Sequence, residues 1–214
     1  MIEKRMGSMP LVDLNLKDFL AQTASKTPVP GGGSIAALSA AIAAALSEMV
    51  AHLTINKKGY EALEEEMHDI VKDAFQYRER FIRAIDKDSD AYNDVLIAFK
   101  LPKGTNQEQT HRKRAIQEAL KKAALVPLDV AREAFKVIEL AGKVLKQGNK
   151  NAVTDAAVAV MMARTAVLSA LYNVKINLST IKDANFIKDV GKEVTHMESE
   201  IVKRERDLLS HVSI

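Results

Sequence analysis

The sequence has no cysteine and no tryptophan, and aromatic residues make up only 5% of its 214 residues. The absence of cysteine excludes disulfides, thiolate nucleophiles and cysteine-ligated zinc, and it fits a reducing, cytoplasmic location. The 31 Lys and Arg residues exceed the 28 Asp and Glu residues by too little to indicate a nucleic-acid partner. This charge balance is compatible with an anionic small molecule as the ligand.

No apolar segment near the start is typical of an export signal. The nearly uncharged run 156–171 contains Arg164 and is shorter than a bilayer span. We therefore expect a soluble protein with no membrane partner.

Glycine and proline are scarce, at 9 and 5 residues, and between them apolar residues recur every three or four positions. This is the period of an amphipathic helix, and no alternating strand pattern competes with it. The predicted helices cover about 14–25, 35–53, 61–99, 107–146, 152–178 and 185–209. We expect an all-α fold, an up-and-down bundle of five to six long helices. It forms one domain over residues 11–214, after an N-terminal extension over residues 1–10.

The predicted helix 152–178 is apolar nearly all round between residues 156 and 171. In a soluble protein such a helix lies at the centre of the bundle. Because so many helical faces are apolar or rich in alanine, we expect a second copy to cover part of the surface. The expected assembly is a homodimer, since closed two-fold assemblies are the commonest kind.

An acidic residue interrupts the apolar stripe of the predicted helix 61–99. At about 100° per residue, one stripe collects Leu63, Met67, Ile70, Ala74, Phe81, Ile85, Tyr92, Val95 and Phe99. Asp88 lies in the middle of this stripe, whereas Asp86 and Asp90 lie on the opposite side. A carboxylate on a packed face needs a partner, a raised pKa or a cleft, because burying it alone is costly. Asp88 is therefore either a structural residue or a general acid and base.

The segment Pro30-Gly31-Gly32-Gly33-Ser34 precedes the alanine-rich helix 35–53. The glycines allow main-chain N–H groups to turn toward one point, and Ser34 is a residue type that caps helix N-termini. We expect an irregular loop that cradles an anion or a polar group, and the alternative is a flexible turn. It is not a nucleotide loop of the usual kind, because no Gly-Lys-Ser/Thr follows it.

Three further polar residues occupy the helix 152–178. Asn173 and Asn177 share one face, where buried amides either join helices or bind a polar ligand. Asp155 lies in the first turn, where an acidic residue commonly complements the helix dipole. It precedes Asn173 by 18 residues, or about 27 Å along the axis, so one ligand scarcely reaches both in a single subunit.

No metal site is expected. The spacings Glu65-x-x-His68 and Glu193-x-x-His196 occur in di-iron bundles, but Glu65, His68 and His196 lie opposite the apolar stripes of their helices. The basic run 111–114 is typical of a solvated face, and it also suits a polycarboxylate tail.

Five motifs occur in one order along the chain: Pro30-Gly31-Gly32-Gly33-Ser34, 86–92 leading to Leu101-Pro102, Pro127-Leu128, Gly148-Asn149 to Asp155, and 172–178. Together they resemble the formiminotetrahydrofolate cyclodeaminase family, which includes methenyltetrahydrofolate cyclohydrolases. The resemblance covers nearly the whole chain from about residue 11. It implies an all-helical dimer without a metal or further cofactor, in which the glycine-rich loop lies at the mouth of a folate cleft.

By motif position, the resemblance places the catalytic aspartate within 86–88, and the helical face selects Asp88. The other positions that it implies for substrate binding are Pro30, Gly31, Gly32, Gly33, Ser34, Arg112, Asn149, Asp155, Asn173 and Asn177.

The expected reaction is an ammonia-lyase-type cyclodeamination. It closes 5-formimino-tetrahydrofolate to 5,10-methenyl-tetrahydrofolate and releases ammonia, with Asp88 moving a proton. The substrate is a reduced folate with a mono- or polyglutamyl tail. The first alternative is methenyltetrahydrofolate cyclohydrolase, which needs the same carboxylate at the same carbon, and the second is a non-catalytic helical interaction module.

Overall fold

The computed structural model describes residues 9–212, which contain six α-helices and no strand. The α-helices are α1 (Leu16–Thr23), α2 (Gly32–His52), α3 (Glu64–Phe99), α4 (Asn106–Gln147), α5 (Val153–Leu178) and α6 (Ala184–Leu209). Short 3-10 turns are η1 (Leu11–Asp13), η2 (Glu61–Leu63) and η3 (Lys150–Ala152). The predicted all-α class is therefore confirmed, and the helix bounds lie within three residues of the predicted ones. Residues 1–8 of the predicted N-terminal extension lie outside the described residues.

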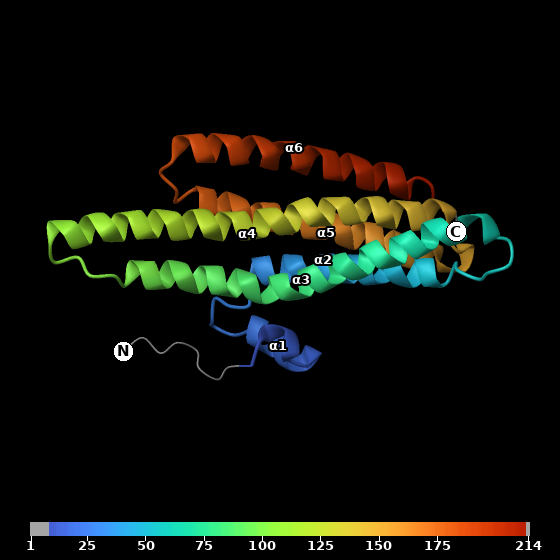
Figure 1. The fold of residues 1–214 in the computed structure, drawn as a ribbon, viewed down its shortest axis with the longest axis horizontal. Helices are drawn as coiled ribbons and strands as arrows, with labels where there is room; N and C mark the ends of the chain where they lie inside the picture. Colours follow the sequence, from blue (N-terminus) through green and yellow to red (C-terminus); the bar gives the residue numbers. More distant parts are fainter. Residues whose placement is uncertain (1–8, 213–214) are drawn as a thin grey trace.

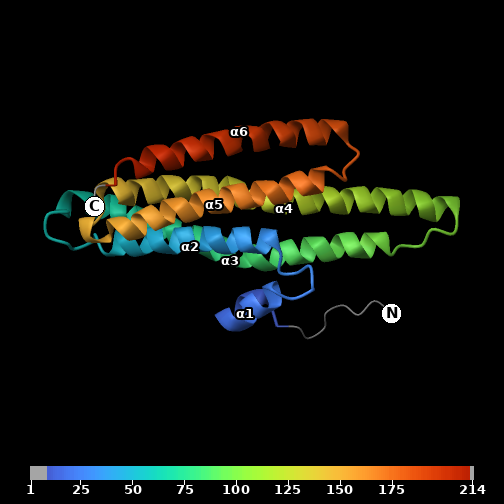
Figure 2. The ribbon, with the colours of Figure 1, turned by 180° about the vertical axis from the view of Figure 1, so that it is seen from behind.

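Helices α2 to α5 lie side by side as an elongated bundle, and α6 covers α4 and α5 from one side (Figures 1 and 2). Helix α4, with 42 residues, is about 63 Å long. Together with α3 it extends past the N-terminus of α2 at one end of the molecule (Figure 1). The short helix α1 lies outside the bundle, near that same N-terminus.

Small side chains fill the centre of the bundle. Alanines with no more than 7% exposure line the inner faces of α2 and α5: Ala36, Ala37, Ala40, Ala41, Ala43, Ala44, Ala156, Ala157, Ala159, Ala163, Ala166 and Ala170. Small side chains allow helix axes to approach closely, because the interaxial distance depends on the side chains at the contact. The predicted central position of the helix 152–178 is confirmed in part: α5 packs against α2, α4 and α6, but Val158, Met161, Tyr172 and Ile176 leave one of its faces 44–66% exposed.

Two helices, Gly32–His52 and Lys150–Leu178, are long and apolar enough to cross a membrane by length and composition alone. Both pack within the bundle, and the core helices of soluble proteins pass the same test. The absence of a membrane partner stays a prediction.

The start of α2 differs from the expected loop. The helix begins at Gly32 rather than after Ser34, and its N-cap residue is Gly31. Ser34 is therefore not the N-cap. It is fully buried in the first turn, where its hydroxyl donates a hydrogen bond to the carbonyl oxygen of Ile85 at 2.9 Å. Beside Gly32 and Gly33, other side chains occupy the space where a Cβ atom would lie.

Candidate active site

Three helices meet at the N-terminal end of α2. The added Cβ of an alanine at Gly33 would overlap the carboxylate of Asp88 on α3. At Gly32 such an atom would lie 2.9 Å from Nδ2 and 3.2 Å from Oδ1 of Asn173 on α5. The absence of side chains at Gly32 and Gly33 therefore allows Asp88 and Asn173 to rest directly on the first turn of α2.

The first turn of α2 presents hydrogen-bond donors that the helix itself does not use. Ile35 is the first residue whose N–H donates back into the helix, to the carbonyl oxygen of Gly31 at 3.1 Å. The N–H groups of Gly32, Gly33 and Ser34 precede it and have no carbonyl partner within the helix. Such an N-terminus attracts negative charge and polar acceptors. The predicted cradle of main-chain donors thus exists, but it is built from a helical turn.

Asp88 is partly buried, and opposing influences act on its carboxyl group. Burial raises the pKa of Asp88 above its ordinary value, because it removes water from the charged form. The main opposing influence is the backbone N–H of Ser34, which favours the charged form. The Ser34 hydroxyl also lies beside the carboxylate, but it directs its proton to Ile85. The resulting carboxyl group has a raised pKa and contacts helix N–H donors, which suits it to accept and return a proton.

The neighbouring acid Asp86 is used for structure. Its carboxylate accepts hydrogen bonds from the N–H groups of Leu11 at 2.8 Å and Val12 at 3.4 Å, so it holds η1 against α3. Of the two acids Asp86 and Asp88, only Asp88 therefore faces the glycines of α2.

Asn173 offers an acceptor at this site. Its Nδ2 donates to the carbonyl oxygen of Ser169 at 2.8 Å, one turn earlier in α5. This contact uses one of the two N–H groups of the amide, and both Nδ2 and Oδ1 lie beside Gly32. Asp88, Asn173 and the α2 N-terminus together present a proton acceptor, a neutral acceptor and backbone donors within one small region.

Asn177 has a different environment from the one expected for a ligand contact. Pro127 lies inside α4 and has no N–H to donate to the carbonyl oxygen of Ala123, four residues earlier. The Nδ2 of Asn177 donates to that oxygen at 2.8 Å. The structure therefore uses Asn177 to satisfy the carbonyl group that the proline leaves unpaired, and this joins α5 to α4.

Other predicted residues are spread along the glycine segment and the bundle. Pro30 is buried and Gly31 partly buried just before α2, next to the Asp88 region. Arg112 donates to the carbonyl oxygen of Phe99 at 2.9 and 3.3 Å, at the far end of α3. Phe99 follows Asp88 by 11 residues, or about 17 Å. Arg112, which lies on α4, is thus outside the immediate Asp88 region and contacts the C-terminal end of the helix that carries Asp88.

Asn149 and Asp155 lie at the opposite end of α2. Asn149 is 6% exposed, and its N–H and Nδ2 donate to Thr54 Oγ1 at 2.9 Å and to the Leu53 carbonyl oxygen at 2.8 Å. Because α2 has 21 residues, this end is about 30 Å from Gly32. The structure therefore does not bring Asn149 or Asp155 together with Asp88 within one chain.

Two features of the site were not singled out as functional from the sequence. Ser89 is 5% exposed, and its hydroxyl has no hydrogen-bond partner among the described residues. Where α3 extends past α2, it also leaves an apolar surface uncovered. Tyr92, Leu96 and Phe99 are 39%, 38% and 49% exposed there. The helical period places Tyr92 and Phe99 on the same face of α3 as Asp88. This was the sequence signal from which the apolar surface could have been identified.

Two surface hollows, of about 560 and 450 Å³, lie on the outer side of α3 and are lined by neither Asp88 nor the α2 N-terminus. Residues 9–212 contain no group of three or more His, Asp or Glu side chains arranged to hold a metal ion. The lack of a metal cofactor stays a prediction.

The fold and the site define a helical-bundle domain that holds a carboxylate against a glycine-rich helix N-terminus. Residues 15–196 match the formiminotransferase-cyclodeaminase family, and the chain belongs to this family. The resemblance seen in the five sequence motifs is thereby confirmed.

Three known proteins illustrate this relationship. A methenyltetrahydrofolate cyclohydrolase from Methylorubrum extorquens is 39% identical over 185 residues, which cover 86% of this chain and 89% of that protein. A formimidoyltransferase-cyclodeaminase from Mus musculus is 33% identical over 186 residues, covering 87% of this chain but only 34% of the mouse protein. The crystal structure of formiminotetrahydrofolate cyclodeaminase from Thermotoga maritima is similar with a TM-score of 0.83 at 34% identity, covering 93% of this chain and 96% of that one.

Proposed function

We propose that the protein is a formiminotetrahydrofolate cyclodeaminase, which closes 5-formimino-tetrahydrofolate to 5,10-methenyl-tetrahydrofolate and releases ammonia. The observation that carries this proposal is the contact of the Asp88 carboxylate with the first turn of α2 at Gly33. Membership of the family and the names of the relatives support a reduced folate as the substrate.

The proposed chemistry needs one proton carrier. N10 attacks the carbon of the protonated formimino group on N5, and a C–N10 bond forms to give a tetrahedral centre. Asp88 accepts the proton from N10 and delivers it to the amino group on that carbon. The carbon–nitrogen bond then breaks, ammonia leaves, and the methenyl cation remains. Positioned proton transfer of this kind contributes about 10²–10⁴-fold in rate.

The surroundings of Asp88 supply the other contacts. The N–H groups at the start of α2 and Oδ1 of Asn173 are suited to polar atoms of a pterin ring. The exposed side chains of Tyr92, Leu96 and Phe99 are suited to the flat middle of the folate. Arg112, which stands at the end of this track, is proposed to hold the carboxylates of a mono- or polyglutamyl tail.

Methenyltetrahydrofolate cyclohydrolase activity is the second candidate, because the relative from Methylorubrum extorquens carries that name and matches over most of its length. In this reaction water adds to the methenyl carbon, and Asp88 accepts one proton from the water and returns it to N5 as the bond between that carbon and N5 breaks. The remaining hydroxyl proton is released as the carbonyl of the 10-formyl product forms. The same carboxylate serves both reactions.

A homodimer is part of the proposal. Large apolar side chains are exposed along one face of α2 and α5: Ile42, Met49, Val158, Met161, Tyr172 and Ile176. Burial of such a face against a second copy would remove it from water. Action in the cytoplasm without a metal or further cofactor also belongs to the proposal.

The purified protein can be offered each folate while the absorbance of the methenyl chromophore is followed. Growth of the chromophore from 5-formimino-tetrahydrofolate, with ammonia released in equal amount, supports the cyclodeaminase. Loss of the chromophore from the methenyl compound above the spontaneous rate assigns the cyclohydrolase instead. If neither folate reacts and calorimetry detects no binding of a reduced folate, the domain is a non-catalytic interaction module.

A further inference from the structure

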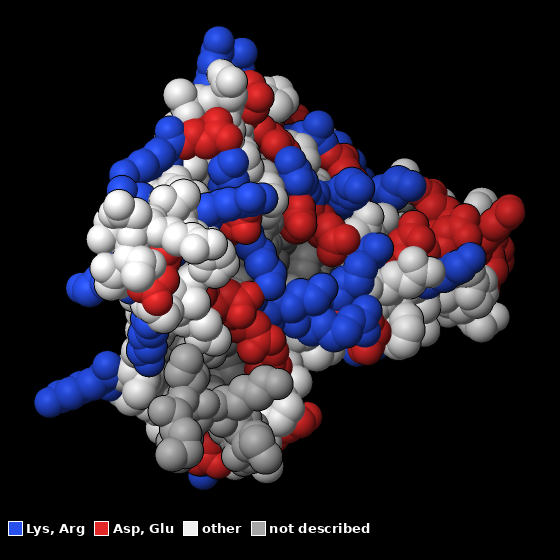
Figure 3. Space-filling model, turned by 60° about the vertical axis from the view of Figure 1, so that its left-hand side comes forward, with Lys and Arg blue, Asp and Glu red and all other residues white. Residues whose placement is uncertain are grey.

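A basic groove runs between α3 and α4, away from the region of Asp88. It is a hollow of about 560 Å³. Its basic side chains are Arg80, Arg83, Lys87, Arg132 and Lys136. Figure 3 shows Lys and Arg side chains around a hollow near the middle of the molecule, with Asp and Glu side chains among them. Only two acidic residues line the groove, so its formal charge is +3.

Both acidic residues of the groove are already paired. Glu133 lies 3.4 Å from Arg80 and Asp129 lies 2.9 Å from Arg132, which also pairs with Glu193 on α6. The three other cations, Arg83, Lys87 and Lys136, have no carboxylate oxygen within 4.0 Å in the part of the chain that is described. The positive charge of the groove is thus not neutralised by the fold.

This arrangement does not serve stability. Arg83 and Lys87 are four residues apart on α3, and like charges at this spacing destabilise a helix. Lys136 adds a third cation from the facing helix. A concave surface also concentrates the potential of the charges that line it, which raises the local concentration of anions.

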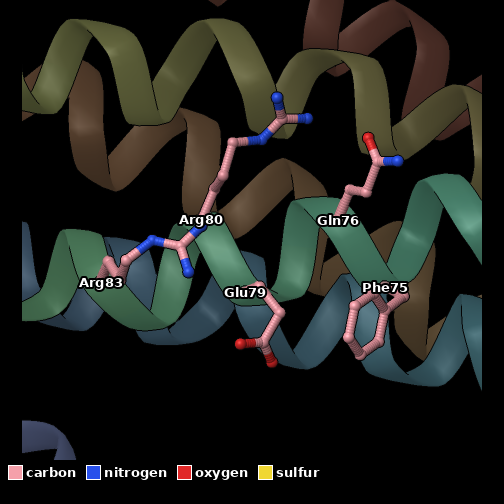
Figure 4. Close-up of a pocket in the computed structure, with 5 residues that line it drawn as sticks. All are labelled: Phe75, Gln76, Glu79, Arg80 and Arg83. Atoms are coloured by element: carbon pink, nitrogen blue, oxygen red, sulfur yellow. The ribbon is translucent and has the colours of Figure 1, made fainter.

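The groove is elongated along α3. A second hollow of about 450 Å³ shares Arg80 and Arg83 with it and continues to Phe75. Figure 4 shows Arg80 and Gln76 pointing toward α4, while Phe75 and Glu79 point away from it. Within the groove itself, the distance along α3 from Arg80 to Lys87 is about 11 Å. This length fits a chain with several anionic groups better than one compact anion.

We propose that the α3–α4 groove is a second ligand site, separate from that of Asp88, for a linear oligoanion with successive phosphate or carboxylate groups. The two sites are separate because Asp88 faces the glycines of α2, whereas Lys87 and Arg83 point about 100° and 140° away from it around α3. The buried side chains of Phe81 and Val130 line the groove and give the ligand an apolar floor.

Calorimetric titration of the full chain with tripolyphosphate, and separately with a folate-free oligo-γ-glutamate, tests this proposal. The groove variant is Arg83→Gln/Lys87→Gln/Lys136→Gln. The control variant, Lys150→Gln/Lys188→Gln/Lys192→Gln, removes the same charge from exposed lysines outside the groove. We expect at least tenfold weaker binding of one or both probes in the groove variant and less than twofold change in the control. The stronger probe at equal charge identifies phosphate or carboxylate as the preferred group.

Equal loss of affinity in both variants would show a general attraction to a basic protein and overturn the proposal. Absence of binding by the wild type to either probe would also overturn it. If neither probe binds but the groove variant raises only the KM of a polyglutamyl folate, the groove belongs to the substrate tail and is not a separate site. Thermal unfolding of both variants confirms that they remain folded.

Discussion

The two ends of helix α2 bury polar groups in different ways. At the C-terminal end, the N–H of Asn149 donates to Thr54 Oγ1 and its Nδ2 donates to the Leu53 carbonyl oxygen. Its Oδ1 accepts a hydrogen bond from the N–H of Asn151, so the side chain is paired at both ends of its amide. At the N-terminal end, the N–H groups of the first turn have no helical partner, and that of Ser34 contacts the Asp88 carboxylate instead. A structural polar cluster satisfies itself, whereas a binding site leaves hydrogen-bonding capacity for its ligand. We therefore propose that, within one chain, the C-terminal end of α2 serves structure and the N-terminal end serves chemistry.

Replacement of Gly33 by alanine gives the largest expected effect at the open end. The added methyl group would overlap the Asp88 carboxylate, and a displacement of about 1 Å at a reacting group costs about 100-fold in rate. We expect kcat to fall by about that factor. In the control Gly191→Ala, the new methyl group meets no atom within 4 Å, so activity should be unchanged. Equal kcat values for the two variants would contradict the placement of Asp88.

A pair of asparagine variants sharpens the comparison of the two ends. Asn149→Ala loses two side-chain hydrogen bonds and should lower the free energy of unfolding by about 2 kcal/mol while leaving kcat/KM unchanged. Asn173→Ala should lower kcat/KM by up to about tenfold, the value of one neutral hydrogen bond, with a smaller loss of stability. Denaturant unfolding and steady-state kinetics of both variants provide the measurement. The opposite pattern would reverse the assignment of the two ends.

The contact between Asn177 and Ala123 predicts a specific double-mutant cycle. Asn177→Leu leaves the Ala123 carbonyl oxygen without a donor and should cost about 1–3 kcal/mol of unfolding free energy. In the Pro127→Ala background, residue 127 regains an N–H for the same oxygen, so the cost should be much smaller. Identical costs in both backgrounds would show that Asn177 does not compensate for the proline.

The stability effect of Asp88 is the smallest expected effect and depends on pH. Burial raises the pKa of Asp88 in the folded state above its unfolded value, so folding favours the protonated form. The contribution of Asp88 to the stability of the wild type is therefore complete below the unfolded pKa of about 3.9. It is lost as the pH rises through the folded pKa. Asp88→Asn should raise Tm at neutral pH, and this gain should disappear near pH 4. Asp90→Asn, on the exposed side of α3, serves as the control.

Local patterns were sufficient to predict the helices and the position of Asp88. The period of 3.6 residues defined all six helices, and the same period placed Asp88 on the packed face of α3 and Asp86 away from it. Asp88 needed no knowledge of other helices, because a carboxylate inside an apolar stripe is unusual in any bundle.

Other features depend on contacts between distant segments. Ser34 was expected at the N-cap, but its hydroxyl reaches the Ile85 carbonyl oxygen, 51 residues away, from inside the helix. Asn177 was expected to bind the ligand, and only the packing of α5 beside Pro127 reveals its bond to Ala123. The basic groove was not foreseen for the same reason, since Lys136 meets Arg83 and Lys87 only once α3 and α4 are adjacent.

Turnover of the Asp88→Asn variant tests the central claim most directly. The amide keeps the shape of the side chain but does not accept and return a proton. We predict that kcat for closure of 5-formimino-tetrahydrofolate falls at least 100-fold, while calorimetry shows folate binding within a few-fold of the wild type. A variant that binds folate and turns it over at nearly the wild-type rate would contradict the assignment of Asp88 as the proton carrier.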